Sequence, residues 1–158
     1  MSKVQITAEP GSPNIVITQE FDAPRELVFR AYTDPELLVR WLGPRDQRLT
    51  VDRFEVRDGG RWRYRFVGPD GEHGFHGVFH GEPGVDGIVQ TAEYESRPGH
   101  VWLEKAVFEE RDGRTLVRSV STYQSVEDRD GVIASGMEFG VREGDERLTE
   151  LLGELRGN

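Results

Sequence analysis

The chain has 158 residues and a formal net charge of −9 at pH 7, with 35% hydrophobic residues, 31% charged residues and no cysteine. This length suits one domain with one hydrophobic core. The missing cysteines exclude disulfides, thiolate nucleophiles and Cys-ligated metal centres. The negative charge disfavours nucleic acid as a partner, because phosphate backbones repel acidic proteins.

The sequence predicts no membrane segment. No stretch reaches the roughly 18 consecutive apolar residues that a membrane helix needs. Residues 1–13 also lack the apolar segment of a secretory signal. We therefore expect a cytoplasmic protein without a membrane partner.

Residues 1–14 are expected to be a loose N-terminal lead-in to a single domain that covers residues 15–158. Prolines and a glycine interrupt any periodicity between residues 10 and 13. Val4 and Ile6 nevertheless alternate with polar residues, as they would in an edge strand. No function is assigned to this segment.

One strand and two short helices are predicted next. Residues 15–21 alternate and are rich in β-branched side chains, which predicts the first strand of the domain. Asp22-Ala23-Pro24 supplies a cap and an early proline for a helix. Thr33-Asp34-Pro35-Glu36 has the pattern of a capping box that opens a second short helix, and Gly43-Pro44 ends this helical part.

The segment from Leu49 to Tyr123 alternates between apolar and polar residues and is divided by turns. The turns are marked by glycine-rich and proline-rich sites, namely Asp58-Gly59-Gly60, Pro69-Asp70-Gly71, Pro83-Gly84, Pro98-Gly99 and Asp112-Gly113. This pattern predicts six antiparallel strands in a meander. The complete sheet is therefore expected to have seven strands.

Residues 128–155 change to a helical period, with small or apolar residues on one stripe and charges elsewhere. The stripe consists of Ile133, Met137, Val141, Gly144, Leu148, Leu151 or Leu152, and Leu155. One long amphipathic helix is predicted. The fold class is then α+β, a curved antiparallel sheet of seven strands around a long C-terminal helix, which is a helix-grip fold. A concave sheet around one helix favours a cavity between them.

Turn geometry assigns the faces of the first long hairpin. A three-residue loop at residues 58–60 pairs Phe54 with Tyr64. Trp62, Tyr64 and Phe66 then share one face of the sheet, since alternate residues point the same way. The arginines between them are expected to face solvent.

A two-residue turn at residues 112–113 pairs Glu104 with Ser121 in the last hairpin. Ala106 then faces Ser119 on the same side. We expect this side to be the inner one, because it combines aromatic with small residues. Burial near an apolar cavity would raise the pKa of Glu104 and suit it as a polar anchor or a general acid or base. The alternative is an ordinary exposed glutamate of a strand.

Other kinds of site find little support in the sequence. His73, His76 and His80 lie close together, but His76 and His80 share the strand face opposite the aromatic residues, and three ligands from one short strand rarely converge on an ion. The glycine pairs lack the lysine of a phosphate loop, and no Gly-x-Ser-x-Gly elbow is present. We expect no metal ion and no cofactor.

An ordered set of short motifs spans about residues 15–155. The set comprises Phe21-Asp22-Ala23-Pro24-Arg25-Glu26-Leu27-Val28-Phe29, Tyr32-Thr33-Asp34-Pro35-Glu36, Trp41-Leu42-Gly43-Pro44, Gly59-Gly60-Arg61-Trp62-Arg63-Tyr64, Asp70-Gly71, Phe75-His76-Gly77 and Ser135-Gly136-Met137-Glu138. Together they resemble the SRPBCC superfamily (START-like, birch-pollen-allergen-like), and more narrowly its AHSA-like branch, named for homology to an activator of the heat-shock chaperone ATPase. The resemblance implies the helix-grip fold and a hydrophobic pocket between sheet and C-terminal helix. It implies no universal catalytic motif.

Binding of a small hydrophobic ligand in this cavity is therefore our leading hypothesis, without catalysis. The expected ligand-binding residues are Trp62, Tyr64, Phe66, Phe79, Tyr94, Glu104, Phe108, Ser119, Tyr123, Met137 and Val141. The aromatic members are equally compatible with a packed core. Two alternatives stay open, a cyclase-type or hydrolase-type enzyme with Glu104 as general base and a co-regulator of a chaperone ATPase with an exposed apolar patch. A homodimer also stays open.

Overall fold

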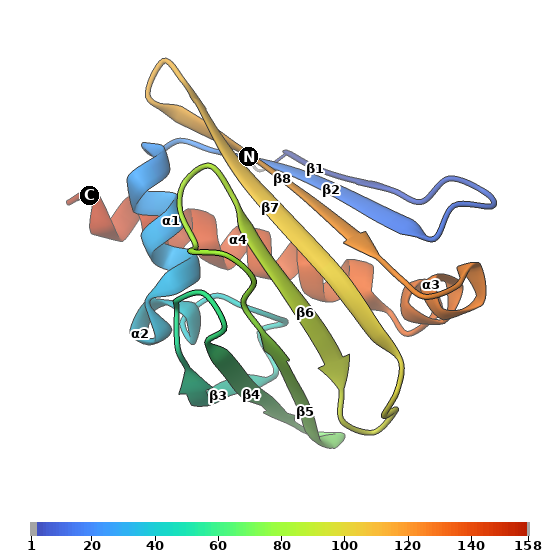
Figure 1. Cartoon of the computed structure of the whole chain (residues 1–158). Coiled ribbons are helices and arrows are strands. Elements are labelled where there is room, and N and C mark those ends of the chain that lie inside the picture. Colours follow the sequence, from blue (N-terminus) through green and yellow to red (C-terminus); the bar gives the residue numbers. More distant parts are fainter. Residues whose placement is uncertain (1–2, 158) are drawn as a thin grey trace.

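A computed structural model of the chain describes residues 3–157 and shows an α+β fold in which one curved antiparallel sheet wraps around a long helix (Figure 1). The elements follow in the order β1 (Lys3–Thr7), β2 (Asn14–Phe21), α1 (Arg25–Thr33), α2 (Pro35–Leu38), β3 (Arg48–Phe54), β4 (Arg61–Gly68), β5 (Gly71–Val78), β6 (Ile88–Tyr94), β7 (Val101–Arg111), β8 (Arg114–Thr122), α3 (Val126–Ala134) and α4 (Met137–Leu155). The helix-grip architecture predicted from the sequence is confirmed. Among the described residues, no helix has the length and apolar character needed to cross a membrane.

The sheet has eight strands in the order β1-β2-β8-β7-β6-β5-β4-β3, not the seven predicted. The additional strand is β1, which pairs with β2 so that Ile6 lies opposite Ile17 and Val4 opposite Gln19. Residues 3–7 of the expected loose lead-in are thus ordered as an edge strand. Without β1, strand β2 would leave a row of unpaired main-chain groups, and the alternation of Val4 and Ile6 matches that edge.

The two short helices after the first predicted strand are confirmed as α1 and α2. Asp34 caps α2, since its side chain accepts a hydrogen bond of 3.0 Å from the main-chain N–H of Glu36. Pro35 occupies the first helical position, where its missing N–H has no consequence. The two helices pack beside each other at one end of the sheet (Figure 1).

The single long C-terminal helix predicted from the sequence is wrong, because the chain breaks into α3 and α4. Gly136 separates them with φ = 89°, a left-handed conformation that glycine adopts without steric cost. Helix α3 begins at Val126, and its cap Ser125 accepts a hydrogen bond of 3.0 Å from the main-chain N–H of Asp128. The apolar spacing continues across the break from Ile133 to Met137, so periodicity alone did not reveal it.

The predicted register of the β7–β8 hairpin is confirmed. Glu104 lies opposite Ser121 and Ala106 opposite Ser119. The two-residue turn has positive φ at both central residues, 53° at Asp112 and 76° at Gly113, as a type I′ turn requires. This turn matches the twist of the strands and fixes their pairing.

The predicted register of the β3–β4 hairpin is wrong, although the predicted face is right. Tyr64 pairs with Val51, not Phe54, and Trp62 pairs with Phe54. The connecting loop is longer than predicted, since the main-chain N–H of Glu55 donates to the carbonyl of Arg61, and a bulge interrupts β3 between Val51 and Arg53. Trp62 and Tyr64 still share the inner face.

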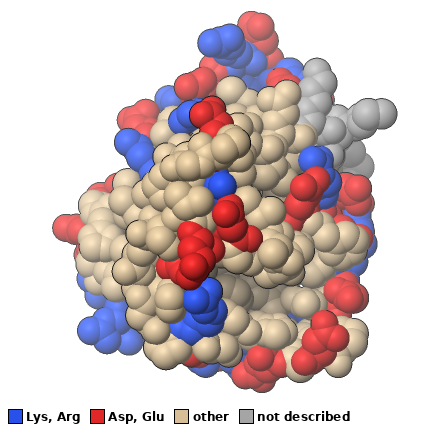
Figure 2. Space-filling model, turned by 90° about the vertical axis from the view of Figure 1, so that its right-hand side faces the viewer, with Lys and Arg blue, Asp and Glu red and all other residues tan. Residues whose placement is uncertain are grey.

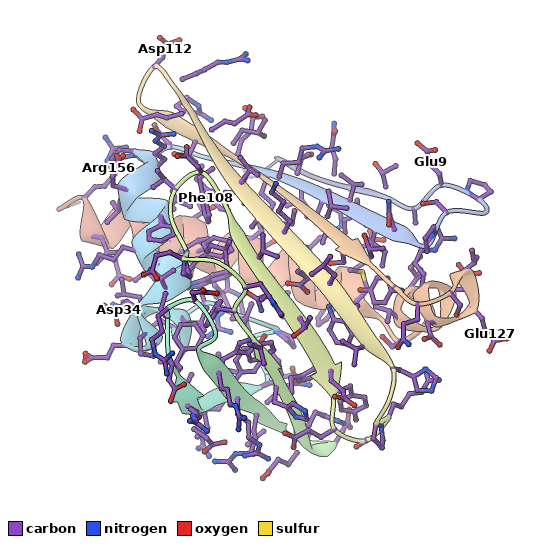
Figure 3. The ribbon with its side chains drawn as sticks, in the orientation of Figure 1. Glu9, Asp34, Phe108, Asp112, Glu127 and Arg156 are labelled. Carbon is purple, nitrogen blue, oxygen red and sulfur yellow. The ribbon has the colours of Figure 1, made fainter. Side chains whose placement is uncertain are left out.

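The hydrophobic core lies where the inner face of the sheet meets α1, α2 and the second half of α4. Leu148, Leu151 and Leu152 of α4 are almost fully buried in it. Figure 3 shows Phe108 in this interior, while Asp112 and other labelled charged residues lie at the periphery. Met137 and Val141, in the first half of α4, are only half-buried and do not belong to this core. The start of α4 therefore does not contribute to the core.

Candidate functional site

Six aromatic side chains from β4 to the residue after β8 form a continuous surface on the inner side of the sheet, here called the aromatic face. They are Tyr64, Phe66, Phe75, Tyr94, Trp102 and Tyr123. Phe75 lies at the centre, with its ring centroid 5.0 Å from that of Tyr94, 5.8 Å from that of Phe66 and 6.3 Å from that of Trp102. All except Tyr123 keep exposed surface. The aromatic face is thus not fully enclosed by the rest of the chain.

The molecule is hollowed at the end where α3 and the first residues of β7 lie (Figure 2). Trp102 is the second residue of β7, and Tyr123 follows β8 beside it with a centroid distance of 5.6 Å. The aromatic face therefore extends toward this end of the molecule.

A cavity of roughly 80 Å³ lies deeper, between α1 and the central strands. Its lining residues are Tyr32, Phe79, Ile88, Gln90, Glu104, Lys105, Ala106 and Ser119. Pockets for drug-sized ligands usually have about 300 Å³ or more. The cavity alone therefore suits a few water molecules or one small chemical group.

Glu104 places a carboxylate at this cavity. The indole Nε1–H of Trp102 donates a hydrogen bond of 2.8 Å to Oε1 of Glu104, and the hydroxyl of Ser121 is a second hydrogen-bond partner. Burial raises the pKa of Glu104, while its hydrogen bonds with Trp102 and Ser121 oppose this rise. Glu104 is half-buried, so it is not the fully exposed strand glutamate of the alternative interpretation. No Lys or Arg side chain forms an ion pair with Glu104 within residues 3–157.

Three tyrosine hydroxyls lie in the electrostatic field of Glu104. Burial, followed by the negative charges of Asp145 and Glu104, raises the pKa of Tyr32. Burial and the charge of Glu104 raise the pKa values of Tyr64 and Tyr123 as well. All three phenols therefore keep their protons at neutral pH and are available as hydrogen-bond donors.

A buried polar chain connects α4, β2 and α1 behind the cavity. Oδ1 of Asp145, on α4, accepts a hydrogen bond of 3.0 Å from Nε2 of Gln19 on β2. Oε1 of Gln19 lies 3.5 Å from the hydroxyl of Tyr32 on α1. Asp145 is 0% exposed, and its Oδ2 has no hydrogen-bond partner among the described residues. The interior thus holds a second carboxylate.

Sequence reasoning missed Tyr32, Gln19 and Asp145. A signal for Asp145 was present, because it lies four residues after Val141 and three before Leu148, on the apolar stripe of the predicted helix. Tyr32 and Gln19 had no comparable signal, since their contacts depend on how α1 packs against the sheet.

The residues expected to bind a ligand fall into separate groups in the structure. The cavity brings together Phe79, Glu104 and Ser119. The aromatic face contains Tyr64, Phe66, Tyr94 and Tyr123.

The remaining four expected residues lie elsewhere. Trp62 and Phe108 are core residues with 2% and 1% exposure. The indole Nε1 of Trp62 has no partner among the described residues. Met137 and Val141 lie on the half-buried first part of α4. The structure thus brings seven of the expected residues onto or beside one surface and places these four around it.

The histidines of β5 are engaged with neighbouring strands. His76 contacts Glu95 through Nδ1 at 2.9 Å and Glu93 through Nε2 at 3.3 Å. Nδ1 of His73 lies 2.8 Å from the hydroxyl of Tyr94. Over the described part of the chain, no three His, Cys, Asp or Glu residues are arranged to hold a metal ion.

Solved structures with the same architecture are known. A crystal structure of a protein from Rhodobacter sphaeroides has 28% identity and a TM-score of 0.86 over 96% of this chain and 99% of that chain. Protein Ms6760 from Mycobacterium smegmatis has 26% identity and a TM-score of 0.86 over 95% of this chain and 97% of that chain. An AHSA1-like protein from Aeromonas hydrophila, with 18% identity and a TM-score of 0.67 over 86% of this chain and 93% of that chain, shares the fold.

The comparison with curated proteins found no match. The sequence model of the family described as "Activator of Hsp90 ATPase homolog 1-like protein" matches residues 22–153, which is most of the chain. This match agrees with the motifs, the sheet order and the position of the long helix. The chain therefore belongs to this family, the AHSA-like branch of the SRPBCC superfamily.

Proposed function

We propose that the protein binds a small, mostly apolar molecule on the inner side of the sheet. The molecule lies between the aromatic face and the first half of α4, with its polar end directed at Glu104. The observation that carries this proposal is the position of Glu104, a half-buried carboxylate that lines a cavity at the edge of a partly exposed aromatic surface.

The uneven burial of α4 supports this location. Its second half is packed into the core through Leu148, Leu151 and Leu152, whereas Met137 and Val141 are only half-buried. Apolar surface left in contact with water costs about 25 cal/mol for each Å². A ligand that covers the aromatic face and the underside of α4 removes this cost, and the gain in free energy favours binding.

The size of the cavity limits what its deepest part accepts. Roughly 80 Å³ accommodates a single polar group with its hydration or a short side branch. The body of the ligand then lies on the aromatic face, toward the hollow seen in Figure 2. This arrangement favours ligands with one polar end and one apolar end.

A thermal-shift screen with small aromatic and alicyclic compounds tests the proposal. A compound present at 100 times its dissociation constant stabilises the protein by about 2.7 kcal/mol. The shift should disappear in Trp102→Leu, which removes an indole of the aromatic face. It should persist in Phe139→Ala, because Phe139 is 60% exposed and lies outside this surface. A screen without any stabilising compound, or shifts that survive Trp102→Leu, would contradict the proposal.

Glu104 also supports a second candidate function, general acid–base catalysis on the bound molecule. Burial raises the pKa of its carboxyl, and a raised carboxyl pKa is the direction that general acid–base catalysis at neutral pH requires. A reaction that depends on this group should lose most of its rate in Glu104→Gln. A reaction whose rate survives that change would remove Glu104 from the mechanism.

A further inference from the structure

We propose that the molecule bound at the inner face is an organic cation, a small amine with an aromatic or alicyclic body whose ammonium group pairs with Glu104. This inference rests on the proposed function and adds the charge of the ligand to it. Its basis is the distribution of charged groups between the interior and the outer surface of the sheet.

Glu104 has hydrogen-bond donors but no positive charge beside it. Trp102 donates through its indole N–H, and Ser121 is the second partner. Burial raises the pKa of Glu104 and these two hydrogen bonds oppose the rise, so a cation beside the carboxylate would further favour its ionised form. Lys105, the next residue of β7, also lines the cavity, but strand alternation directs its side chain to the opposite face, where it is exposed, and it forms no ion pair with Glu104. Within residues 3–157, the negative charge of Glu104 is therefore left without a cationic partner.

Two arginines of β4, a more distant strand of the same sheet, are engaged on its outer face. Arg63 binds Glu95 through Nε and Nη2, each at 2.8 Å. Arg65 binds Asp52 through Nε at 2.8 Å. These ion pairs hold the two guanidinium groups on the outer face, away from Glu104.

Asp145 increases the negative charge of the same interior. It is 0% exposed, receives one hydrogen bond from Gln19, and leaves Oδ2 without a partner among the described residues. The charges of Asp145 and Glu104 both act on Tyr32, which lines the cavity. Removing a carboxylate from water without a paired cation is unfavourable. Glu104 at the cavity, with Asp145 acting on Tyr32 from behind it, favours a positively charged group there.

The aromatic rings add a second attraction for a cation. Trp102 both donates to Glu104 and lies 5.6 Å from Tyr123 between ring centroids. The faces of Trp and Tyr rings carry negative electrostatic potential and attract ammonium groups within about 6 Å. Because the N–H edge of Trp102 is turned toward Oε1 of Glu104, an ammonium group gains both attractions only when it pairs with the carboxylate from the side of a ring face. Neither an alcohol nor a carboxylic acid of the same size gains both interactions.

The electrostatic field at the protein surface favours the same class of ligand. The chain has a net charge of −9, and charged side chains of which many are acidic surround the hollow in Figure 2. Such a field raises the local concentration of cations and repels carboxylate compounds. Access to the site and binding within it thus select the same sign of charge.

Three probes of nearly equal size test the inference, namely benzylamine, benzyl alcohol and benzoate. Their dissociation constants are measured by calorimetry at neutral pH with the full chain. Benzylamine should bind about tenfold more tightly than benzyl alcohol, a difference of about 1.4 kcal/mol, and benzoate should bind most weakly. In Glu104→Gln, which keeps an acceptor for the Trp102 indole, the preference for the amine should disappear while benzyl alcohol binds as before.

Glu109→Gln is the matched control, because Glu109 is an exposed glutamate on the same strand, and this variant should keep the preference. Should Glu104→Gln fail to fold, wild-type NMR gives the second readout. Nuclear Overhauser effects should join the benzylamine methylene group to the Trp102 indole, and their absence in the bound state would overturn the inference.

The outcomes separate the two proposals. If benzyl alcohol or benzoate binds as tightly as benzylamine at the inner face, the inference is wrong and the proposed function stands. If the amine preference survives Glu104→Gln, the cation binds elsewhere and the inference is wrong. If none of the three probes binds, both the inference and the proposed function are contradicted.

Discussion

The indole Nε1–H of Trp102 lies 2.8 Å from Oε1 of Glu104, two residues further along β7. Residues two apart in a strand share a face, so the donor and the acceptor point together into the interior. The hydrogen bond holds the carboxylate beside the aromatic face and partly offsets the loss of water around it. Glu104 is thereby fixed on the cavity side of the sheet.

Replacement of Glu104 by Gln should make the protein more stable at high pH and leave it nearly unchanged at low pH. Burial raises the pKa of Glu104 in the folded state, so the unfolded chain releases this proton at a lower pH than the folded chain. The free energy of unfolding of the wild type then falls as the pH rises between the two pKa values, by about 1.4 kcal/mol for each unit that separates them. The free energy of unfolding of Glu104→Gln should not decline over this pH range.

Urea unfolding from about pH 4 to about pH 8 measures this difference. The exposed Glu109 on the same strand provides the control, since Glu109→Gln should follow the wild-type curve. Parallel curves for Glu104→Gln and the wild type would show that burial does not disfavour the charge of Glu104.

Gly77→Ala should destabilise the protein by about 1–3 kcal/mol, as overpacking in a closed space does. A Cβ atom at Gly77 would lie 1.8 Å from the carbonyl oxygen of Thr91 and 2.8 Å from Cζ2 of Trp62. Strands β5 and β6 would have to move apart. Gly84→Ala is the control, because a Cβ atom there meets nothing within 4 Å. Equal urea midpoints for the two variants would refute this steric explanation.

Glu95→Gln should lower the free energy of unfolding at neutral pH by up to about 1 kcal/mol, which is the usual upper value for an exposed ion pair. The two hydrogen bonds from Arg63, followed by that of His76, lower the pKa of Glu95 to about 2. This stabilisation is present above the ordinary pKa of glutamate and is lost as the pH falls toward about 2.

Acid unfolding followed by circular dichroism therefore should show the Glu95→Gln and wild-type curves converging at the lowest pH. Glu72→Gln is the comparison, since Glu72 makes a contact of 3.2 Å to Arg65 and is 52% exposed. A larger loss in Glu72→Gln than in Glu95→Gln would reverse the expected order.

Gln19→Leu should cost about 1.5–3 kcal/mol, because it leaves the buried carboxylate of Asp145 without the Nε2 donor. Adding Asp145→Leu should recover part of this loss, which makes the two effects non-additive by about 0.5–3 kcal/mol. A double-mutant cycle by urea unfolding measures the coupling. Additive effects would mean that the hydrogen bond between Gln19 and Asp145 contributes nothing in solution.

Features of the fold that depend on a few neighbouring residues could be predicted from the sequence. The Asp112-Gly113 pair dictates a type I′ turn, so the β7–β8 register and the residues that share a face with Glu104 followed from it. The capping motif Thr33-Asp34-Pro35-Glu36 likewise located the start of α2, where Asp34 is the residue that caps the helix. These features depend on a few neighbouring residues.

Other features depend on contacts between distant segments. The bulge at residues 51–53 changed the pairing of Tyr64 without changing its face, because alternation survives when the partner strand gains one residue. The left-handed Gly136 divided a helix whose apolar pattern continues through it. Tyr32 reaches the cavity, and Asp145 comes into electrostatic range of Tyr32, only because α1 and α4 pack together against the sheet.

The bulge in β3 has a consequence for association between molecules. Strand β3 is one edge of the sheet, and a flat edge with unpaired main-chain groups invites a second sheet to add to it. The bulge between Val51 and Arg53 interrupts that row, and Asp52 there holds Arg63 and Arg65 in ion pairs. A second strand approaching this edge would meet an irregular backbone and a charged cluster, a combination that protects sheets from fibril-like growth.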